Sequence, residues 1–178
     1  AIQDMRSVRA LLVDGNLTAR SILRSMLIDL GLQADHIRQV SRYNEARGEI
    51  EYHRYDLILC EHHFSETQQT GADLLDEVRA GNHLPFSTVV VMVTSEATYG
   101  KVAEAAEAAL DSYLLRPHTH NDLAERLKTA RLRKQALEDI FEALEAEQYE
   151  VATERCLARV EAQSEYWVYA ARIGGELL

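Results

Sequence analysis

The sequence has few of the features that mark secreted or membrane-spanning proteins. Its 178 residues include only two cysteines, Cys60 and Cys156, which lie far apart in the chain. We interpret them as reduced structural thiols, neither a disulfide nor a metal pair. No stretch approaches the ~18 consecutive apolar residues of a membrane-spanning helix, and the first residues lack the pattern of a signal peptide. We therefore expect a cytoplasmic protein that does not enter a membrane.

Positive charge is also scarce. The net charge is −10, and residues 1–130 and 131–178 both carry a net negative charge. Proteins that bind nucleic acids usually neutralise phosphates with a basic face. The composition therefore argues against DNA or RNA as a partner and favours protein partners.

The motifs of common enzyme classes are missing as well. The sequence contains no nucleophile elbow, no phosphate-binding loop and no catalytic Cys–His arrangement. Asp14 and Glu61 are conceivable as a general acid–base pair, but nothing that would complete a hydrolytic site accompanies them. We expect that the protein is not an enzyme.

Short apolar runs alternate with segments of helical periodicity through the first 130 residues or so. The runs predict strands at 8–13, 36–40, 56–60, 89–93 and 112–115, and the segments between them predict helices at 19–30, 42–53, 74–80 and 97–110. Regular alternation of this kind predicts an α/β fold with a doubly wound, five-stranded parallel sheet and helices on both faces.

The pattern after Thr119 is entirely helical. Thr119 and Asp122 resemble a capping box, in which two residues three apart exchange hydrogen bonds at the start of a helix. Neither Gly nor Pro then occurs before Gly174, so we expect one helix from 119 to about 145, a turn at 146–148 and two further helices. This change predicts two domains, residues 1–130 and a helical extension, residues 131–178.

The long predicted helix carries a heptad pattern with one charged position. Its members follow alternating four- and three-residue steps: Leu123, Leu127, Ala130, Lys134, Leu137, Phe141 and Leu144. One interpretation is an amphipathic helix that packs on the sheet and then on the next helix of the same chain. The other is a parallel coiled coil, which would make the protein a homodimer.

Four predicted strands end in polar side chains. Asp14 follows the first strand, Glu61 the third, Thr94 the fourth and Arg116 the fifth. Because the carboxyl ends of parallel strands meet at one edge of a sheet, we expect these side chains to lie close together. Such a group could bind a cation or an anion, or it could be a closed cluster of ion pairs.

The same strand ends carry a resemblance to a known family. The sequences LLVD before Gly15, LILCE ending at Glu61, VTSEA at 93–97 and YLLRP at 113–117 resemble the receiver domain of bacterial response regulators over about residues 6–130. In that family an acidic pair after strand one and an aspartate after strand three hold Mg²⁺. The aspartate accepts phosphate from a histidine kinase, and a Thr or Ser and a Lys then sense the phosphoryl group. The resemblance implies a role in two-component signalling.

Three positions depart from the family pattern. Gly15 replaces the second member of the acidic pair, Glu61 replaces the phospho-accepting aspartate, and Arg116 replaces the lysine. The loop 61–71 is also about two residues longer than usual. Mg²⁺ needs tight octahedral oxygen geometry, and the longer Glu61 side chain misplaces an in-line attack. We therefore expect Mg²⁺ binding to be lost or weak.

These departures suggest that Glu61 takes the place of a phosphorylated aspartate. Arg116 is a planar donor suited to a carboxylate, and with Thr94 it is expected to hold Glu61. The domain would then rest in one state without phosphate, as a protein-interaction or dimerisation module. The alternative is a conventional receiver switch that is weakly phosphorylated at Glu61.

The resemblance also implies roles for two residues near the fifth strand. Tyr113 matches an aromatic switch residue, which would turn inward if Glu61 mimics phosphate; a partly exposed strand tyrosine is the alternative. The peptide bond before Pro117 is expected to be cis. His62 and His63 are weak candidates for a Zn²⁺ or Ni²⁺ site.

The C-terminal part resembles a second family loosely. Residues 146–158 have the small and aromatic positions of the first helix pair of a tetratricopeptide-like repeat, although the usual Gly and Pro are absent. Because one such repeat is not stable alone, we expect the chain to be a fragment of a longer repeat protein.

Overall fold

The computed structural model describes residues 5–95, 112–116 and 118–177. The chain folds into two compact units, Ala1–Leu127 and Lys128–Leu178. The boundary expected after residue 130 and the boundary in the structure both fall within one helix, α5 (His120–Ala136).

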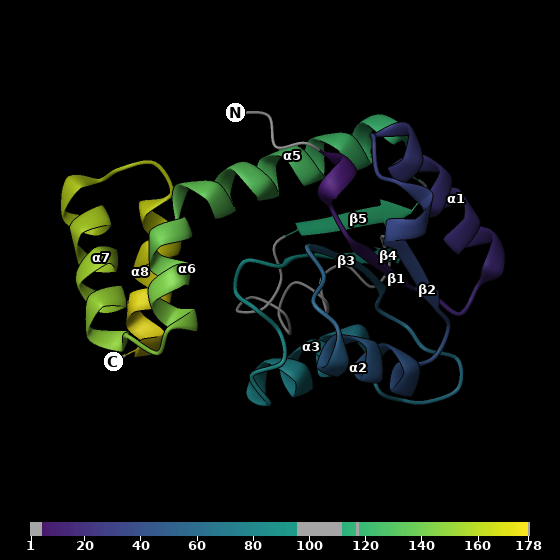
Figure 1. The fold of residues 1–178 in the computed structure, drawn as a ribbon, viewed down its shortest axis with the longest axis horizontal. Coiled ribbons are helices and arrows are strands. Elements are labelled where there is room, and N and C mark those ends of the chain that lie inside the picture. The colour runs from purple at the N-terminus through teal and green to yellow at the C-terminus, as the bar shows by residue number, and fades with distance from the viewer. Residues whose placement is uncertain (1–4, 96–111, 117, 178) are drawn as a thin grey trace. The chain divides into compact units, whose positions relative to one another are not determined.

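The first unit is built on a five-stranded parallel sheet with the strand order β2-β1-β3-β4-β5. The strands are β1 (Ala10–Val13), β2 (Ile37–Val40), β3 (Leu57–Glu61), β4 (Val89–Ser95) and β5 (Ser112–Arg116). This arrangement confirms the predicted doubly wound parallel sheet (Figure 1).

The three central strands of the sheet, β1, β3 and β4, are almost completely buried. Every residue of β1 and β3 is buried, and β4 is buried up to Thr94. Strands covered on both faces are expected to be apolar throughout, whereas the edge strand β2 buries only its first and last residues. The apolar runs in the sequence therefore reflect the position of each strand in the sheet.

Helices cover both faces of this sheet. The helices α2 (Tyr43–Tyr52) and α3 (Gly71–Ala80) lie on one face, and α1 (Leu17–Asp29) and the start of α5 lie on the other (Figure 1). The helix expected at 97–110 lies outside the described residues.

The helices that follow β1 and β3 begin with side-chain caps. The Asn16 side chain accepts a hydrogen bond from the backbone N–H of Ala19 at 3.0 Å and so caps α1. Thr70 and Asp73 form a complete capping box at the start of α3, since each side chain accepts a hydrogen bond from the other's backbone N–H. These caps fix where the chain enters each helix after the loops that follow β1 and β3.

Helix α2 is capped by a residue distant in sequence. Its own N-cap residue, Arg42, makes no side-chain cap, but Glu66 from the loop after β3 accepts a hydrogen bond from the Tyr43 N–H at 2.8 Å. In the same loop the buried Phe64 ring packs edge-on against the Tyr43 ring, with centroids 5.5 Å apart. The loop is therefore attached to α2 by one polar and one apolar contact.

The single long helix expected at 119–145 was a wrong prediction. Helix α5 ends at Ala136, and α6 (Glu138–Glu145) begins after Leu137, whose backbone has φ −109° and ψ 14°. Leu137 and Ile140 are almost fully buried, so tertiary packing decides the backbone here although the stretch contains neither Gly nor Pro. The capping box at Thr119 and Asp122 is confirmed, with hydrogen bonds of 2.8 and 3.2 Å.

The heptad positions are buried without a second chain. Leu123, Leu127, Ala130, Leu137, Phe141 and Leu144 are all buried, and the Lys134 ammonium lies 4.6 Å from the centre of the Phe141 ring. These residues come from two helices, α5 and α6, and not from one continuous seam. The burial favours packing within the chain over an exposed coiled-coil surface.

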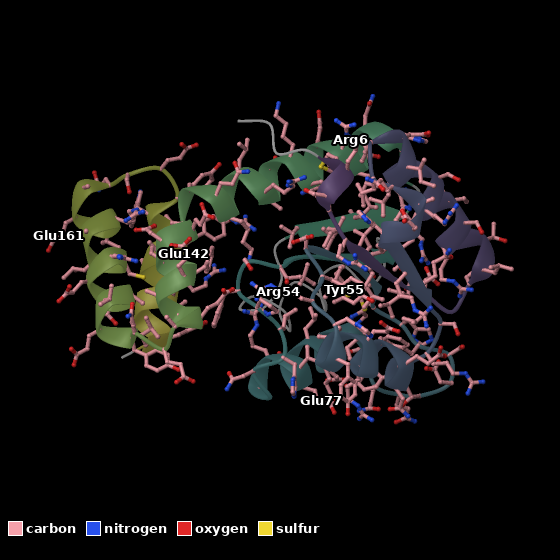
Figure 2. The ribbon with its side chains drawn as sticks, viewed as in Figure 1. Arg6, Arg54, Tyr55, Glu77, Glu142 and Glu161 are labelled. Carbon is pink, nitrogen blue, oxygen red and sulfur yellow. The ribbon has the colours of Figure 1, made fainter. Side chains whose placement is uncertain are left out.

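The second unit continues with α7 (Tyr149–Ala162) and α8 (Trp167–Leu177). Gly174 allows α7 and α8 to approach closely, because a Cβ atom there would lie 3.2 Å from the Cβ of Cys156. Asp139 and Arg159 join α6 and α7 through an ion pair of 2.6 Å. The exposed side chains of this unit include Glu142 and Glu161 (Figure 2). The tetratricopeptide-like assignment stays a prediction.

No helix in the described part of the chain is long and apolar enough to cross a membrane.

The first residue of α3 offers a test of how tightly the core packs at the end of β3. A Cβ atom on Gly71 would lie 2.8 Å from the carbonyl oxygen of Glu61 and 2.7 Å from Sδ of Met92. We expect Gly71→Ala to destabilise the fold by about 1–3 kcal/mol, because overpacking forces backbone shifts. Urea unfolding measures the change.

Gly48 provides a matched control. It lies within α2, and a Cβ atom added there would meet no neighbouring atom within 4 Å. Gly48→Ala is expected to stabilise the protein by about 0.5–1 kcal/mol through helix propensity. Equal effects of the two substitutions would contradict the close packing at Gly71.

Candidate functional site

Two buried carboxylates lie at the carboxyl ends of neighbouring strands. Asp14 directly follows β1 and Glu61 ends β3, and the two strands are paired so that Val13 lies beside Cys60. Only 4% of Asp14 and 9% of Glu61 is exposed. Burying a carboxylate is costly unless a partner compensates its charge, so the surroundings of these two groups decide what the site can do.

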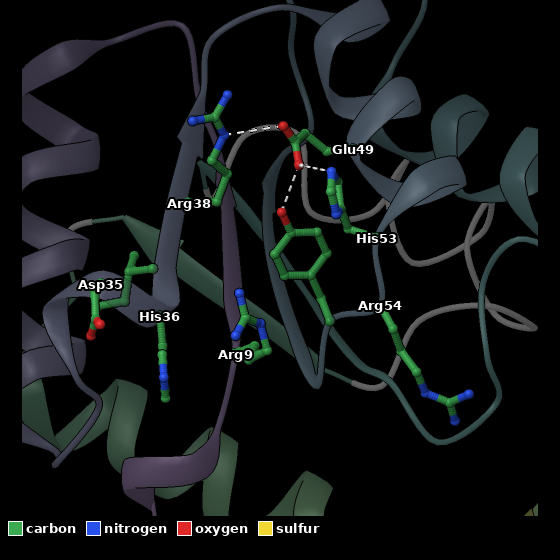
Figure 3. Close-up of a pocket in the computed structure, with 9 residues that line it drawn as sticks. Arg9, Asp35, His36, Arg38, Glu49, His53 and Arg54 are labelled. Carbon is green, nitrogen blue, oxygen red and sulfur yellow. Dashed lines mark hydrogen bonds and ion pairs between the residues drawn. The ribbon is translucent and has the colours of Figure 1, made fainter.

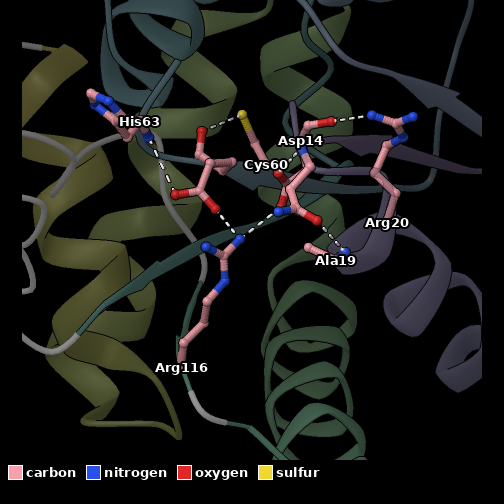
Figure 4. A network of polar contacts seen from close by, with 8 residues as sticks. Asp14, Ala19, Arg20, Cys60, His63 and Arg116 are labelled. Atoms are coloured by element: carbon pink, nitrogen blue, oxygen red, sulfur yellow. Dashed lines mark hydrogen bonds and ion pairs between the residues drawn. The ribbon is translucent and has the colours of Figure 1, made fainter. Parts of the chain in front are cut away.

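Arg116 supplies the compensating charge. Its Nη2 donates a hydrogen bond to Oδ2 of Asp14 at 2.7 Å and another to Oε2 of Glu61 (Figure 4). Arg116 ends β5, which is separated from β3 by β4, so its long side chain reaches back over the sheet edge. One guanidinium therefore bridges two carboxylates from different strands.

Asp14 also forms hydrogen bonds through its side chain and through both of its backbone polar groups. Its Oδ1 accepts a hydrogen bond from the Asn16 N–H at 2.8 Å, and its carbonyl oxygen accepts one from Nη1 of Arg20 at 2.6 Å. Its own N–H donates to the carbonyl of Val40 at 3.1 Å. The position of this carboxylate is fixed by the backbone of β1 and by the start of α1.

Glu61 is less completely satisfied. Its Oε1 lies 3.5 Å from the His63 N–H, a long hydrogen bond. Burial raises the pKa of the Glu61 carboxyl; the charge of Arg116 opposes this rise and the charge of Asp14 adds to it. Ionised Glu61 therefore depends strongly on the guanidinium beside it.

The side chains at this site offer few free ligands for a magnesium ion. Gly15 offers no side-chain oxygen, and the two carboxylates present are already bound by one guanidinium. Mg²⁺ requires several oxygen ligands in octahedral geometry. Within residues 5–95, 112–116 and 118–177, no group of three or more His, Cys, Asp or Glu side chains is placed to hold a metal ion.

The four histidines near this edge of the sheet lie in different settings. Nε2 of His120 shares a hydrogen bond of 2.8 Å with Oδ2 of Asp29, and His63 pairs with Thr70 through an isolated backbone bridge. Nδ1 of His62 and Nδ1 of His118 are buried without a hydrogen-bond partner among the described residues. Burial lowers the pKa of both imidazoles, which favours the neutral form.

The remaining predicted residues are only partly described. Thr94 is buried near the end of β4, and its expected contact with Glu61 stays a prediction. The side chain of Tyr113 and the peptide bond before Pro117, predicted to be turned inward and cis respectively, lie outside the described residues.

Sequence reasoning missed two residues that shape the site. Asn16 caps α1 and donates its N–H to Asp14, and Arg20, one turn into that helix, binds the Asp14 carbonyl. The Asn at the start of a helical pattern was a readable signal for a cap. The contact of Arg20 was not readable, because it depends on how the helix turns back over the strand end.

Comparison with known proteins identifies the family. A family model described as the response regulator receiver domain matches residues 10–128. The chain belongs to the response regulator receiver family. The receiver resemblance seen in the sequence is thereby confirmed, and the matched segment covers the whole sheet and the carboxylate site.

Individual receiver proteins agree with this assignment. The chain is 31% identical to the chemotaxis protein CheY of Pseudomonas aeruginosa over 124 residues, which cover 68% of this chain and 94% of the relative. It is 30% identical to CheY-3 of Vibrio cholerae over 125 residues, 68% of this chain and 90% of that protein.

Solved structures show the same receiver fold. The chemotaxis response regulator CheY4 of Vibrio cholerae superposes with a TM-score of 0.59 at 22% identity, over 69% of this chain and 98% of that one. The receiver domain of the sensor histidine kinase PA1611 of Pseudomonas aeruginosa gives a TM-score of 0.56 at 25% identity, over 68% and 94%. The PA1611 structure has a magnesium ion coordinated in its active site cleft.

The raised pKa of Glu61 predicts a specific pH dependence. The folded-state pKa lies above the ordinary value of 4.5, so ionising Glu61 costs stability as the pH rises from about 4.5 through the folded pKa. Glu61→Gln removes this cost. We expect the stability of the variant relative to wild type to increase between pH 4.5 and pH 8 in urea unfolding.

Glu77 is the matched control for this experiment. The Tyr43 hydroxyl donates a hydrogen bond to its carboxylate at 2.7 Å and lowers its pKa. Its contribution is therefore present above about pH 4.5 and lost as the pH falls. Glu77→Gln should lose stability relative to wild type as the pH rises to about 4.5 and should then differ from it by a constant amount up to pH 8. A rise in its relative stability over that upper range, as in Glu61→Gln, would show that burial of Glu61 is not the cause.

Proposed function

We propose that this receiver domain works without phosphorylation, as a protein-interaction module of two-component signalling. The observation that carries the proposal is the Arg116 guanidinium, which bridges Asp14 and Glu61 (Figure 4). In this arrangement a positive charge of the protein itself stands between the carboxylates that would otherwise bind a metal ion. The receiver would then rest in one state that needs neither metal nor phosphate, and it would catalyse no reaction.

The length of Glu61 supports this proposal. Its carboxylate extends one methylene beyond the position of an aspartate and meets the guanidinium of Arg116. A negative group near the arginine of β5 resembles the charge that a phosphoryl group would bring to the family's lysine. Because both oxygens of Asp14 are also in use, displacing Arg116 would leave two buried carboxylates uncompensated.

The competing proposal is a conventional switch that is weakly phosphorylated at Glu61. It requires Glu61 to leave Arg116 and attack a donor, and it requires a metal site that Gly15 does not complete. A Glu61 carboxylate that is held in an ion pair with Arg116 is poorly placed for an in-line attack on a phosphoryl donor.

The proposed partners of the molecule are proteins. The acidic chain and the C-terminal helices α6 to α8 suit contacts with another protein better than contacts with a nucleic acid.

Homodimerisation is also part of the proposal, but the buried heptad positions mean that a dimer would use a different surface. Light scattering should then show twice the 20.2 kDa mass of the chain; a monomer at all concentrations would contradict the dimer.

Intact-mass spectrometry after incubation with acetyl phosphate and Mg²⁺ tests the central proposal. We expect the wild-type protein to gain no phosphoryl group, because Glu61 is held by Arg116 and Gly15 provides no metal ligand. A phosphoryl adduct that forms in wild type and disappears in Glu61→Gln would overturn the proposal.

A triple variant serves as the matched positive control. Gly15→Asp, Glu61→Asp and Arg116→Lys together restore the three family residues, and a Cβ atom at Gly15 would approach no atom closer than 3.6 Å. The triple variant is expected to accept phosphate. If it folds, as judged by its circular dichroism, and still gains no phosphate, these three residues are not what silences the site.

A further inference from the structure

The sheet has a second polar pocket, at the edge opposite to the carboxylate site. It has a volume of about 640 Å³ and lies where β1, β2 and β3 begin. Its lining includes Arg9 just before β1, His36 and Arg38 around the start of β2, and Arg54 and Tyr55 before β3. This volume falls within the range of about 300–1,000 Å³ that is typical of small-molecule sites.

The charge of this pocket is opposite to that of the whole chain. Three arginines and two histidines line it, whereas its carboxylates are Asp35 and Glu49 alone. The net charge of the lining is therefore positive even with neutral histidines, in a protein with a net charge of −10. A local positive field of this kind attracts anions.

On one side of the pocket, Glu49 accepts hydrogen bonds from two other lining residues (Figure 3). Its Oε1 accepts a hydrogen bond from Nε of Arg38 at 3.1 Å, and its Oε2 accepts one from the Tyr55 hydroxyl at 2.7 Å. Nε2 of His53 lies 3.9 Å from the same Oε2. The carboxylate thus orients Arg38 through Nε and leaves the two terminal nitrogens of that guanidinium, which point away from Glu49 in Figure 3, without a hydrogen bond to Glu49.

Arg9 contributes a guanidinium that no described residue neutralises. Its backbone is fixed, because its N–H donates to Oδ2 of Asp56 at 2.9 Å and its carbonyl accepts the N–H groups of Asp56 and Leu57. Its side chain forms no hydrogen bond or ion pair with a described residue, and it lines the pocket (Figure 3). Nδ1 of His36, in the same lining, is also buried without a partner in the described part of the chain.

We propose that this pocket binds the phosphate group of a small phosphorylated molecule. A guanidinium matches the oxygens of a phosphate with two parallel hydrogen bonds, and Arg9 offers one on a rigid backbone. Arg38 provides a second guanidinium in the lining of the same cavity. The pocket shares no residue with the carboxylate site, so this inference does not depend on whether Glu61 is phosphorylated.

NMR titration of the ¹⁵N-labelled protein tests this inference. The probes are inorganic phosphate, ribose 5-phosphate and AMP, with adenosine as the uncharged comparison. We expect saturable shifts at the amides of Arg9, Ile37 and Arg38 with the phosphate-bearing probes and none with adenosine. Tighter binding of an ester than of inorganic phosphate assigns the site to a phosphorylated metabolite, and equal binding assigns it to the free anion.

Arg9→Gln is the decisive variant. Because the Arg9 side chain has no described partner, the substitution should leave the melting temperature unchanged and weaken phosphate binding by about tenfold or more, as for a lost hydrogen bond to a charged group. Arg126→Gln on the exposed surface of α5 removes the same charge outside the pocket and should bind as wild type does.

Arg116→Lys separates this site from the carboxylate site and should also bind phosphate normally. The inference is wrong if no probe gives saturable shifts up to about 10 mM, an affinity weaker than about −3 kcal/mol. It is equally wrong if Arg9→Gln and Arg126→Gln bind alike, or if Arg116→Lys abolishes the shifts.

Discussion

The bridge from Arg116 to Asp14 and Glu61 is the interaction on which the carboxylate site depends. The parallel sheet brings two carboxylates to adjacent strand ends and buries both. Two such charges repel each other and lose most of their hydration, so they need a cation. In this protein the cation is a side chain of the same chain, and it is fixed to the sheet through β5. We propose that this guanidinium takes the place of the charge that the family obtains from a metal ion.

The surroundings of the site reinforce this fixed arrangement. Asp14 is held by Asn16 and Arg20 at the start of α1. The loop after β3 is attached to α2 through Phe64 and Glu66, and the close approach of Gly71 to the Glu61 carbonyl leaves little room for the loop to shift. Under the proposed function, a surface formed by these elements keeps its shape without a phosphoryl signal and is recognised constitutively by a protein partner.

Much of the fold could be predicted from the sequence because its signals are local. Buried parallel strands are apolar throughout, and the capping box at Thr119 requires residues only three apart. The position of the strand ends also follows from the sheet, so the meeting of Asp14, Glu61 and Arg116 could be expected before the structure was known. Their geometry could not, because the reach of Arg116 past β4 depends on the final packing.

Three features lacked such local signals. The break at Leu137 lies in a stretch that contains neither Gly nor Pro, and it coincides with the burial of Leu137 and Ile140. The cap that Glu66 provides for α2 joins residues 23 positions apart. The basic pocket collects residues from the starts of three strands, and no motif in the sequence links them.

A crystal structure of the protein grown with millimolar MnCl₂ tests the guanidinium bridge most directly. Mn²⁺ takes oxygen ligands as Mg²⁺ does, and its anomalous scattering reveals it unambiguously. We expect Nη2 of Arg116 within hydrogen-bond distance of both Asp14 and Glu61, and no anomalous peak between the two carboxylates. A manganese peak at that position, with Arg116 turned away, would contradict the bridge and would show that the site binds a metal ion as in a conventional receiver.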